Sequence, residues 1–407
     1  MHLRFPLASL ALLPSFFQFS PQVGVAQTTT VCQPSVTEPI IVDDHDQVAE
    51  AGLRAEPPLI DTKGFGFAWP DTQMGVIKTV EGYEWFTSDG AFHPRQLWEG
   101  HWVGNNNYGS VVTTVGTLDN PLGTGIPRDV TISPNPDPGV NPNYESYTYI
   151  GGGPVVQVPE GMMGAGNLIA GYHAELPSDT LYAVHGLAAS WDNGLHWTDL
   201  GEVVRPNQSF APQLAPGFDE IGDGPLVLSG DHKYFYFYFP DWPAGTTTTT
   251  HISVARVLAA SLLEAAFGSK HPHAVPFEKF YEGNWHLQPG IGGASTDLIP
   301  NALPQVGGYL DVHYDSALQR YVMILDNDVT FYYSESVDAL TWTPPFALGN
   351  FANGTTTLAP YVTSVGLGDN PQVLGKTFYI YYTFLREENG GQPRKGNSLR
   401  RITLTCQ

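Results

Sequence analysis

Three carboxylic acids in the sequence stand beside residues that could leave room for a sugar ring. Asp71 follows Trp69 by two positions, Glu175 follows His173 by two positions, and Asp223 stands between two glycines. Hydrolysis of a glycosidic bond needs one acid to protonate the leaving oxygen and a base or nucleophile on the opposite face of the ring. Asp71, Glu175 and Asp223 are therefore catalytic candidates, although each carboxylate could equally cap a turn or a strand end.

A second set of polar and aromatic residues could bind a substrate. In an extended strand, His173 shares a face with Glu175, and His313 shares a face with Asp311. Aromatic rings on strand ends and insertions offer surfaces on which sugar rings stack, although any single ring could instead pack inside the fold. The residues expected to bind substrate are Trp69, His173, Trp285, Asp297, Asp311 and His313.

The charge balance narrows the range of partners. The chain has 18 Lys and Arg against 40 Asp and Glu, which gives a net charge of −22. Such a surface repels phosphate backbones and anionic membranes, so we expect neither a nucleic acid nor a membrane as partner. A neutral carbohydrate is compatible with this charge.

Signatures of other chemistries are missing from the sequence. There is no H-E-x-x-H motif for a metal hydrolase and no phosphate-binding P-loop. A sialidase would need a cluster of arginines for the substrate carboxylate, and arginine is scarce here. We therefore expect no cofactor and no metal site of the His-rich kind, while a Ca²⁺ held by Asp oxygens in a central channel would leave no sequence signature.

The pattern of the chain is that of an all-β protein. Short β-branched and aromatic runs alternate with Gly- and Pro-rich turns, and Ala255–Phe267 is the one clear helix candidate. The runs fall into five groups with a shared rhythm, which predicts a five-bladed β-propeller. The groups are Gly64–Trp98, Gly152–Gly201, Gly222–Val257, Gly308–Gly349 and Ala359–Cys406.

The two ends of the chain suggest how the ring closes. Residues 1–26 read as a signal peptide, with an apolar run after His2 and Arg4, and residues 27–407 as a single propeller domain. Cys32 and Cys406 are the only two cysteines. In the oxidising, extracellular or periplasmic compartment that a signal peptide implies, we expect them to form a disulfide joining the N- and C-terminal segments.

Two turns carry a pattern whose role is structural. Ser190–Trp197 matches S-x-D-x-G-x-x-W, the Asp box, and Ser336–Trp342 is a shorter copy without the glycine. The Ser and Asp oxygens can accept backbone N–H groups in such a turn while the Trp fills the blade. Asp192 and Asp338 are therefore not counted as catalytic.

Several short stretches resemble five-bladed propeller glycoside hydrolases of the family 43-like group and its distant uncharacterised relatives. They are Trp69-Pro-Asp71, Gly171-Tyr-His-Ala-Glu175, Ala188-Ala-Ser-Trp-Asp192, Gly222-Asp-Gly-Pro225, Val254-Ala-Arg256 and Ala317-Leu-Gln-Arg-Tyr321. The resemblance implies three carboxylates that converge from different blades at the mouth of the channel. It makes Asp71 the base, Glu175 the acid, and Asp223 the residue that tunes the acid or holds a sugar hydroxyl.

The expected protein is a secreted, monomeric glycoside hydrolase that cleaves a neutral poly- or oligosaccharide with a carboxylate acid/base pair in the central channel. The alternative is a propeller that binds carbohydrate, or serves at the cell surface, without catalysis. Convergence of the three carboxylates would favour the enzyme.

Overall fold

The computed structural model describes most of the chain after residue 31. The described residues are 32–44, 70, 72–87, 96–98, 101–103, 109–121, 123, 128–147, 149–176, 182–210, 219–242, 251–299, 309–386 and 398–407. Trp69, Asp71 and the expected signal peptide lie outside them. Cys32–Gln407 form one compact unit.

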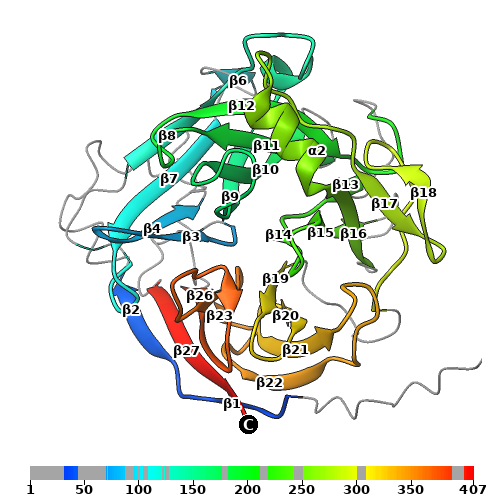
Figure 1. Ribbon diagram of the computed structural model, residues 1–407. Helices are drawn as coiled ribbons and strands as arrows, with labels where there is room; N and C mark the ends of the chain where they lie inside the picture. Colours follow the sequence, from blue (N-terminus) through cyan, green and yellow to red (C-terminus); the bar gives the residue numbers. More distant parts are fainter. Residues whose placement is uncertain are drawn as a thin grey trace, which may run out of the picture. The chain divides into compact units, whose positions relative to one another are not determined.

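The predicted five-bladed β-propeller is confirmed: five sheets of mainly antiparallel strands are arranged around a central axis (Figure 1). The first blade contains β3 (Gly75–Thr79), β4 (Gly82–Thr87), β7 (Gly109–Gly116) and β8 (Arg128–Ser133). The second contains β9 (Tyr149–Gln157), β10 (Leu168–Leu176), β11 (Tyr182–Ser190) and β12 (Trp197–Val204). The third contains β14 (Leu226–Leu228), β15 (Tyr234–Trp242), β16 (His251–Leu258), β17 (Glu278–Tyr281) and β18 (Asn284–Pro289).

The last two blades complete the ring. The fourth contains β19 (Tyr309–Asp315), β20 (Arg320–Asp326), β21 (Thr330–Ser336) and β22 (Phe346–Asn350). The fifth contains β24 (Thr363–Gly366), β26 (Thr377–Arg386) and β27 (Ser398–Cys406), together with β1 (Pro34–Val36) and β2 (Ile40–Asp44). Smaller elements are β5 (Gln96–Trp98), β6 (His101–Val103), β13 (Asp219–Ile221), β23 (Thr357–Leu358), β25 (Val373–Leu374) and the 3₁₀ turn η1 (Tyr144–Ser146).

The innermost strands of the five blades are β3, β9, β14, β19 and β24. Thr72 Oγ1, just before β3, donates a hydrogen bond to Gly152 O on β9. Farther along, a Cβ atom added to Gly75 would lie 2.6 Å from the Cβ of Val155, so only glycine allows this approach. The starts of the inner strands therefore share one end of the channel, and their ends share the other.

The helix expected over Ala255–Phe267 begins later than predicted. Strand β16 continues to Leu258, and the helical residues are α2 (Ala259–Leu263) followed by a π-helical turn, η2 (Glu264–Gly268). Ala255 and Val257 pair with β15 and are buried against its phenylalanines. Strand pairing and burial therefore override local helix propensity up to the point where the pairing with β15 ends.

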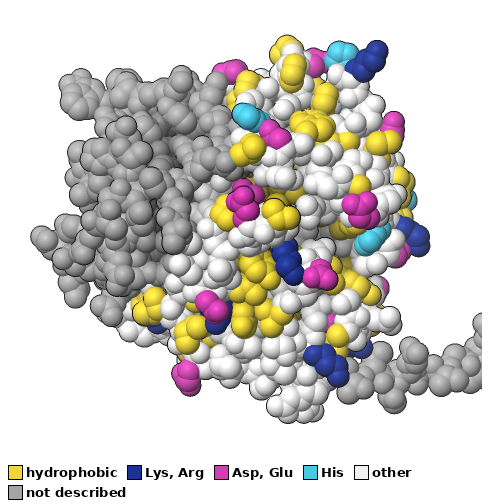
Figure 2. Space-filling model, turned by 60° about the vertical axis from the view of Figure 1, so that its left-hand side comes forward, with side chains coloured by type: hydrophobic (Ala, Val, Ile, Leu, Met, Phe, Trp, Pro, Cys, Tyr) yellow, Lys and Arg dark blue, Asp and Glu magenta, His cyan; other side chains and the backbone are white. Residues whose placement is uncertain are grey.

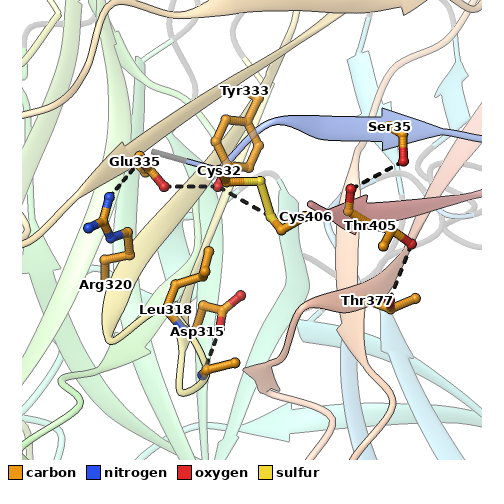
Figure 3. Close-up of a disulfide and its surroundings, with 11 residues drawn as sticks. Cys32, Ser35, Asp315, Leu318, Arg320, Tyr333, Glu335, Thr377, Thr405 and Cys406 are labelled. Carbon is orange, nitrogen blue, oxygen red and sulfur yellow. Dashed lines mark hydrogen bonds and ion pairs between the residues drawn. A yellow bond between two sulfur atoms is a disulfide. The ribbon is translucent and has the colours of Figure 1, made fainter. Parts of the chain in front are cut away.

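The ring is closed by pairing between the two ends of the chain. Strands β1 and β2 both pair with β27, which puts the N-terminal segment beside the last strand (Figure 1). Pro34 lies opposite Cys406 in this pairing, and Cys32 and Cys406 form the expected disulfide. Figure 3 shows Tyr333 above this disulfide, with its hydroxyl 3.9 Å from Cys406 Sγ and hydrogen-bonded to Glu335.

We predict that replacing both cysteines, C32A with C406A, lowers the free energy of unfolding by about 4 kcal/mol, because the bond closes a very long loop in the unfolded chain. Denaturant unfolding of the double variant and the native protein measures the difference. Thiol titration of the denatured, unreduced protein should find no free thiol. Two free thiols per chain would contradict the disulfide.

The turn between β11 and β12 is held by the hydrogen bonds expected for its sequence. Ser190 Oγ accepts from Gly194 N at 2.8 Å, and Asp192 Oδ1 accepts from His196 N at 2.9 Å. Trp197, 1% exposed, donates its Nε1–H to Gly194 O and packs edge-on against Phe86 of the first blade. The Ser336–Trp342 turn is similar, and Ala339 takes a positive φ of 68° where the other turn has Asn193 with a φ of 57°. Trp197 thus packs its turn against Phe86 of the first blade, and Trp342 packs the second turn against Tyr238 of the third blade.

We predict that W197A lowers the free energy of unfolding by about 3–5 kcal/mol, the usual range for truncating a buried aromatic residue. The neighbouring L195A, in the same turn but 46% exposed, is the matched control and should change stability by less than about 0.5 kcal/mol. Denaturant unfolding compares the two. Equal stability of W197A and L195A would show that the ring at position 197 is not structural.

Candidate functional site

Two of the three expected catalytic carboxylates meet at one histidine. Glu175, on β10, pairs with Tyr149 at the start of β9, and Asp223 lies three residues before β14. Between them lies His173, with its Nε2 3.7 Å from Glu175 Oε1 and its Nδ1 3.5 Å from Asp223 Oδ1. The structure thus brings side chains from the second and third blades together at the strand-start end of the channel.

The burial of these three groups is graded. The side chain of His173 is 7% exposed, that of Asp223 is 17% exposed, and that of Glu175 is 31% exposed. His173 is therefore the most buried of the three side chains, and the two carboxylates are more exposed to solvent. Because both lie within 4 Å of one imidazole, they are no more than about 10 Å apart, compatible with the separations of glycosidase carboxylate pairs.

A second histidine, His185, contacts both His173 and the backbone beside Asp223, and it was not identified from the sequence. His185 on β11 pairs with His173 on β10, and their ring centroids are 6.0 Å apart. Burial, and to a lesser degree the neighbouring His173, lowers the pKa of His185 to about 3, so its ring is neutral. Its Nε2 lies 2.7 Å from Gly222 O, which fixes the backbone beside Asp223. The signal in the sequence was one histidine on each of two adjacent buried strands.

The electrostatics of the site act on Asp223. Burial raises the pKa of Asp223 above its usual range, and the negative charge of Glu175 raises it further. The nearby His173 opposes these effects and lowers it, but the net direction is upward. Asp223 therefore holds a proton more tightly than an ordinary aspartic acid, a property that a general acid requires.

We predict a specific pH dependence for the stability of D223N. Because the folded pKa of Asp223 is raised, its contribution to stability is present below the unfolded value of about 3.9 and is lost as pH rises through the folded pKa. The melting temperature of D223N relative to the native protein should therefore increase from pH 4 to pH 7. Calorimetry at several pH values measures this.

The matched control is D369N, because Lys78 lowers the pKa of the exposed Asp369. Its melting temperature relative to the native protein should show the opposite trend with pH. A D223N difference that falls as pH rises would contradict the raised pKa.

Trp285 and Asp297 do not join this cluster. Trp285 lies on β18, the outermost strand of the third blade, where its ring packs on Phe280 and under the Arg256 guanidinium, 4.0 Å from the ring centroid. Asp297 accepts hydrogen bonds from the backbone N–H groups of Ile252 and Ile299. Both residues have local structural partners.

Asp311 and His313 lie on the inner strand β19, with Asp311 Oδ2 3.1 Å from His313 Nε2. Asp311 also accepts the backbone N–H of Ser364 on β24. These contacts place the pair in the channel, farther from the strand starts than Glu175 and Asp223. Asp71 and Trp69 lie outside the described residues, so their roles stay predictions.

The described residues offer no evident site for a metal ion. Among them, no three His, Cys, Asp or Glu side chains gather as metal ligands. Nor does any helix in the described part of the chain have the length and apolar character to cross a membrane.

Comparison with known proteins gives similar folds but no family. No protein-family model matches the chain, and no curated protein does. Among solved structures, the catalytic domain of a GH62 α-L-arabinofuranosidase from Coprinopsis cinerea has 13% identity and a TM-score of 0.43, covering 86% of this chain and 95% of that one. Zg3597, a family 117 glycoside hydrolase from Zobellia galactanivorans, has 10% identity and a TM-score of 0.49, covering 85% and 86%.

An N-acetylgalactosamine deacetylase from F. plautii, solved with blood group B trisaccharide, also matches, with 11% identity, a TM-score of 0.42 and coverage of 84% and 93%. Glycoside hydrolases, expected from the sequence resemblance, are thus among the matching structures. At these identities the likeness concerns the fold alone, so the activity of this chain rests on its own site.

Proposed function

We propose that the protein is a secreted glycoside hydrolase whose acid/base pair lies at the strand-start end of the propeller channel. The observation that carries the proposal is the contact of Glu175 and Asp223, from different blades, with the single imidazole of His173. Glycoside cleavage requires a proton donor and a proton acceptor that are separated in space. Two carboxylates that contact different nitrogens of one imidazole, one of them with a raised pKa, meet this requirement.

The proposal assigns proton donation to Asp223 and proton acceptance to Glu175. The sequence resemblance implied the acid role for Glu175, but the raised pKa belongs to Asp223. In the reaction, the Asp223 carboxyl protonates the glycosidic oxygen as the bond to the anomeric carbon breaks. Glu175 takes a proton from the water whose oxygen bonds to that carbon. The sequence resemblance implied the base role for Asp71, which lies outside the described residues and stays a candidate for a further carboxylate.

His173 acts as a positioning residue in this scheme. It contacts both carboxylates through different ring nitrogens and is itself nearly buried. Its ring packs edge-on against Tyr149, 6.2 Å away, and against His185. Packing of this kind fixes the separation of the two carboxylates.

A neutral glycan is the proposed substrate. The net charge of −22 disfavours polyanionic sugars. On the face shown in Figure 2, acidic side chains are scattered among hydrophobic and uncharged ones. The Cys32–Cys406 disulfide is compatible with the proposed extracellular or periplasmic location, where such bonds persist.

The test is a panel of neutral polysaccharides and aryl glycosides, with reducing-sugar release as the readout. We predict that E175Q and D223N each lower turnover of the active substrate by about 10²-fold or more, as expected for losing an acid or a base. The exposed carboxylate variant D369N is the matched control and should keep full turnover. Circular dichroism checks that each variant is folded.

Two outcomes would contradict the proposal. Full turnover by folded E175Q would remove this carboxylate from the mechanism. Binding of a glycan without any cleavage would identify the protein as a carbohydrate-binding propeller instead.

A further inference from the structure

Two tyrosines lie at the strand-start end of the channel, in blades that supply nothing to the carboxylate cluster. Tyr309 is the first residue of β19 in the fourth blade, and Tyr361 lies two residues before β24 in the fifth blade. Their ring centroids are 4.5 Å apart, with an angle of 62° between the ring planes. Both side chains are half-buried, whereas Tyr333 and Tyr382 in the same blades are completely buried. The Tyr309–Tyr361 pair therefore lies at the edge of the packed core.

Hydrogen bonds link this end of β19 to the strand that pairs with Glu175. Thr72 Oγ1 donates to Gly152 O on β9 at 2.9 Å. The next residue, Gln73, donates its side-chain Nε2–H to Leu310 O at 2.8 Å, and Leu310 directly follows the first tyrosine of the pair. Glu175 pairs with the first residue of β9. Because two consecutive residues reach the beginnings of both β9 and β19, the tyrosine pair and Glu175 lie at the same end of the channel.

The backbone at Tyr361 is held in a conformation that tyrosine rarely adopts. Its φ is +64°, in the left-handed region, where a bulky side chain is unusual. On one side, Ala359 N donates to Asp328 O at 2.6 Å. On the other, Pro360 O accepts from Thr383 N at 3.0 Å. Strain of this kind persists only where the surroundings fix it, and it is concentrated at binding and catalytic sites.

A buried carboxyl positions the two tyrosines relative to each other. Asp326 lies opposite Tyr309 in the pairing of β19 with β20 and is 0% exposed. Its Oδ1 accepts the backbone N–H of Asp328 at 3.1 Å. The backbone N–H of Val362, which follows Tyr361, also bonds to this carboxyl. Asp326 thus contacts both the strand that carries one ring and the turn that carries the other.

We propose that the Tyr309–Tyr361 pair is a sugar-binding subsite of the candidate active site and holds the unit next to the sugar whose bond is cleaved. Aromatic rings are apolar surfaces on which the C–H face of a sugar packs. The fourth and fifth blades follow the second and third in the ring, so an oligosaccharide bound across this end of the channel contacts the pair as well as Glu175 and Asp223 (Figure 1). The inference rests on the proposed function, and it narrows the substrate to a neutral glycan of at least two sugar units.

The test compares tyrosine variants for their affinity toward xylotetraose, cellotetraose and mannotetraose by isothermal titration calorimetry. All are made in E175Q, so that cleavage does not interfere. Y361A and Y361G both remove one ring, and Y309A removes the other. Glycine adopts a positive φ without steric cost, so Y361G should melt at a higher temperature than Y361A and keeps the test valid if Y361A does not fold. The matched control is Y281A, which removes a half-buried tyrosine from the outer strand β17.

We expect Y361A, Y361G and Y309A to bind the best tetrasaccharide about tenfold more weakly or worse, the usual effect of removing an aromatic anchor. Y281A should leave the affinity unchanged, and Y361F, which keeps the ring, should retain most of it. With Glu175 present, the same ring-removing variants should raise KM for the tetrasaccharide. They should leave turnover of the corresponding 4-nitrophenyl monosaccharide glycoside unchanged, because that substrate does not reach the subsite.

Unchanged affinity in folded Y361G and Y309A would overturn the inference, and so would an equal loss in Y281A or the failure of every tetrasaccharide to bind. An equal fall in turnover of the monosaccharide glycoside would show that the pair is structural. A loss of affinity confined to the Tyr309 and Tyr361 variants, in a protein that cleaves none of the substrates, would instead retain the sugar-binding subsite and reject the glycosidase.

Discussion

The pairing of β1 and β2 with β27 is the constraint on which the rest of the structure depends. Without it, the fifth blade would present β27 as an unpaired edge strand. The Cys32–Cys406 disulfide adds a covalent link at the point where Pro34 meets Cys406. A closed ring fixes the positions of the blades relative to one another. Asp223 from the third blade and Glu175 from the second blade can therefore each contact a different nitrogen of the His173 imidazole.

Closure also explains why the two ends of the channel differ chemically. The inner strands run in the same direction, so residues before or at their starts gather at one end and residues after their ends gather at the other. At the first end, side chains of the second and third blades supply two carboxylates on a buried histidine. Farther along the channel, a cavity is lined by residues of all five inner strands, among them the apolar side chains of Val155, Leu226 and Tyr314.

The sequence predicted features that depend on local pattern and missed those that depend on pairing. Alternating strands, the Ser190–Trp197 turn and the two terminal cysteines were sufficient for the five-bladed ring and its disulfide. The pairing of His185 with His173 and the end of β16 at Leu258 depend on register between strands, which the sequence pattern does not give. Trp285 and Asp297 were chosen by residue type, but an arginine and two backbone N–H groups are their actual partners. The pKa of Asp223 is raised mainly because the side chain is buried, and the sequence alone does not show which aspartates are buried.

The central claim is that a glycosidic bond is cleaved where Glu175 and Asp223 meet His173. The most direct measurement is a crystal structure of D223N with the oligosaccharide that the native protein cleaves. The account predicts a sugar bound at the strand-start end of the channel, with its glycosidic oxygen within hydrogen-bond distance of residue 223 and Glu175 on the other side of the anomeric carbon. An intact oligosaccharide whose scissile bond lies anywhere else on the propeller would contradict it.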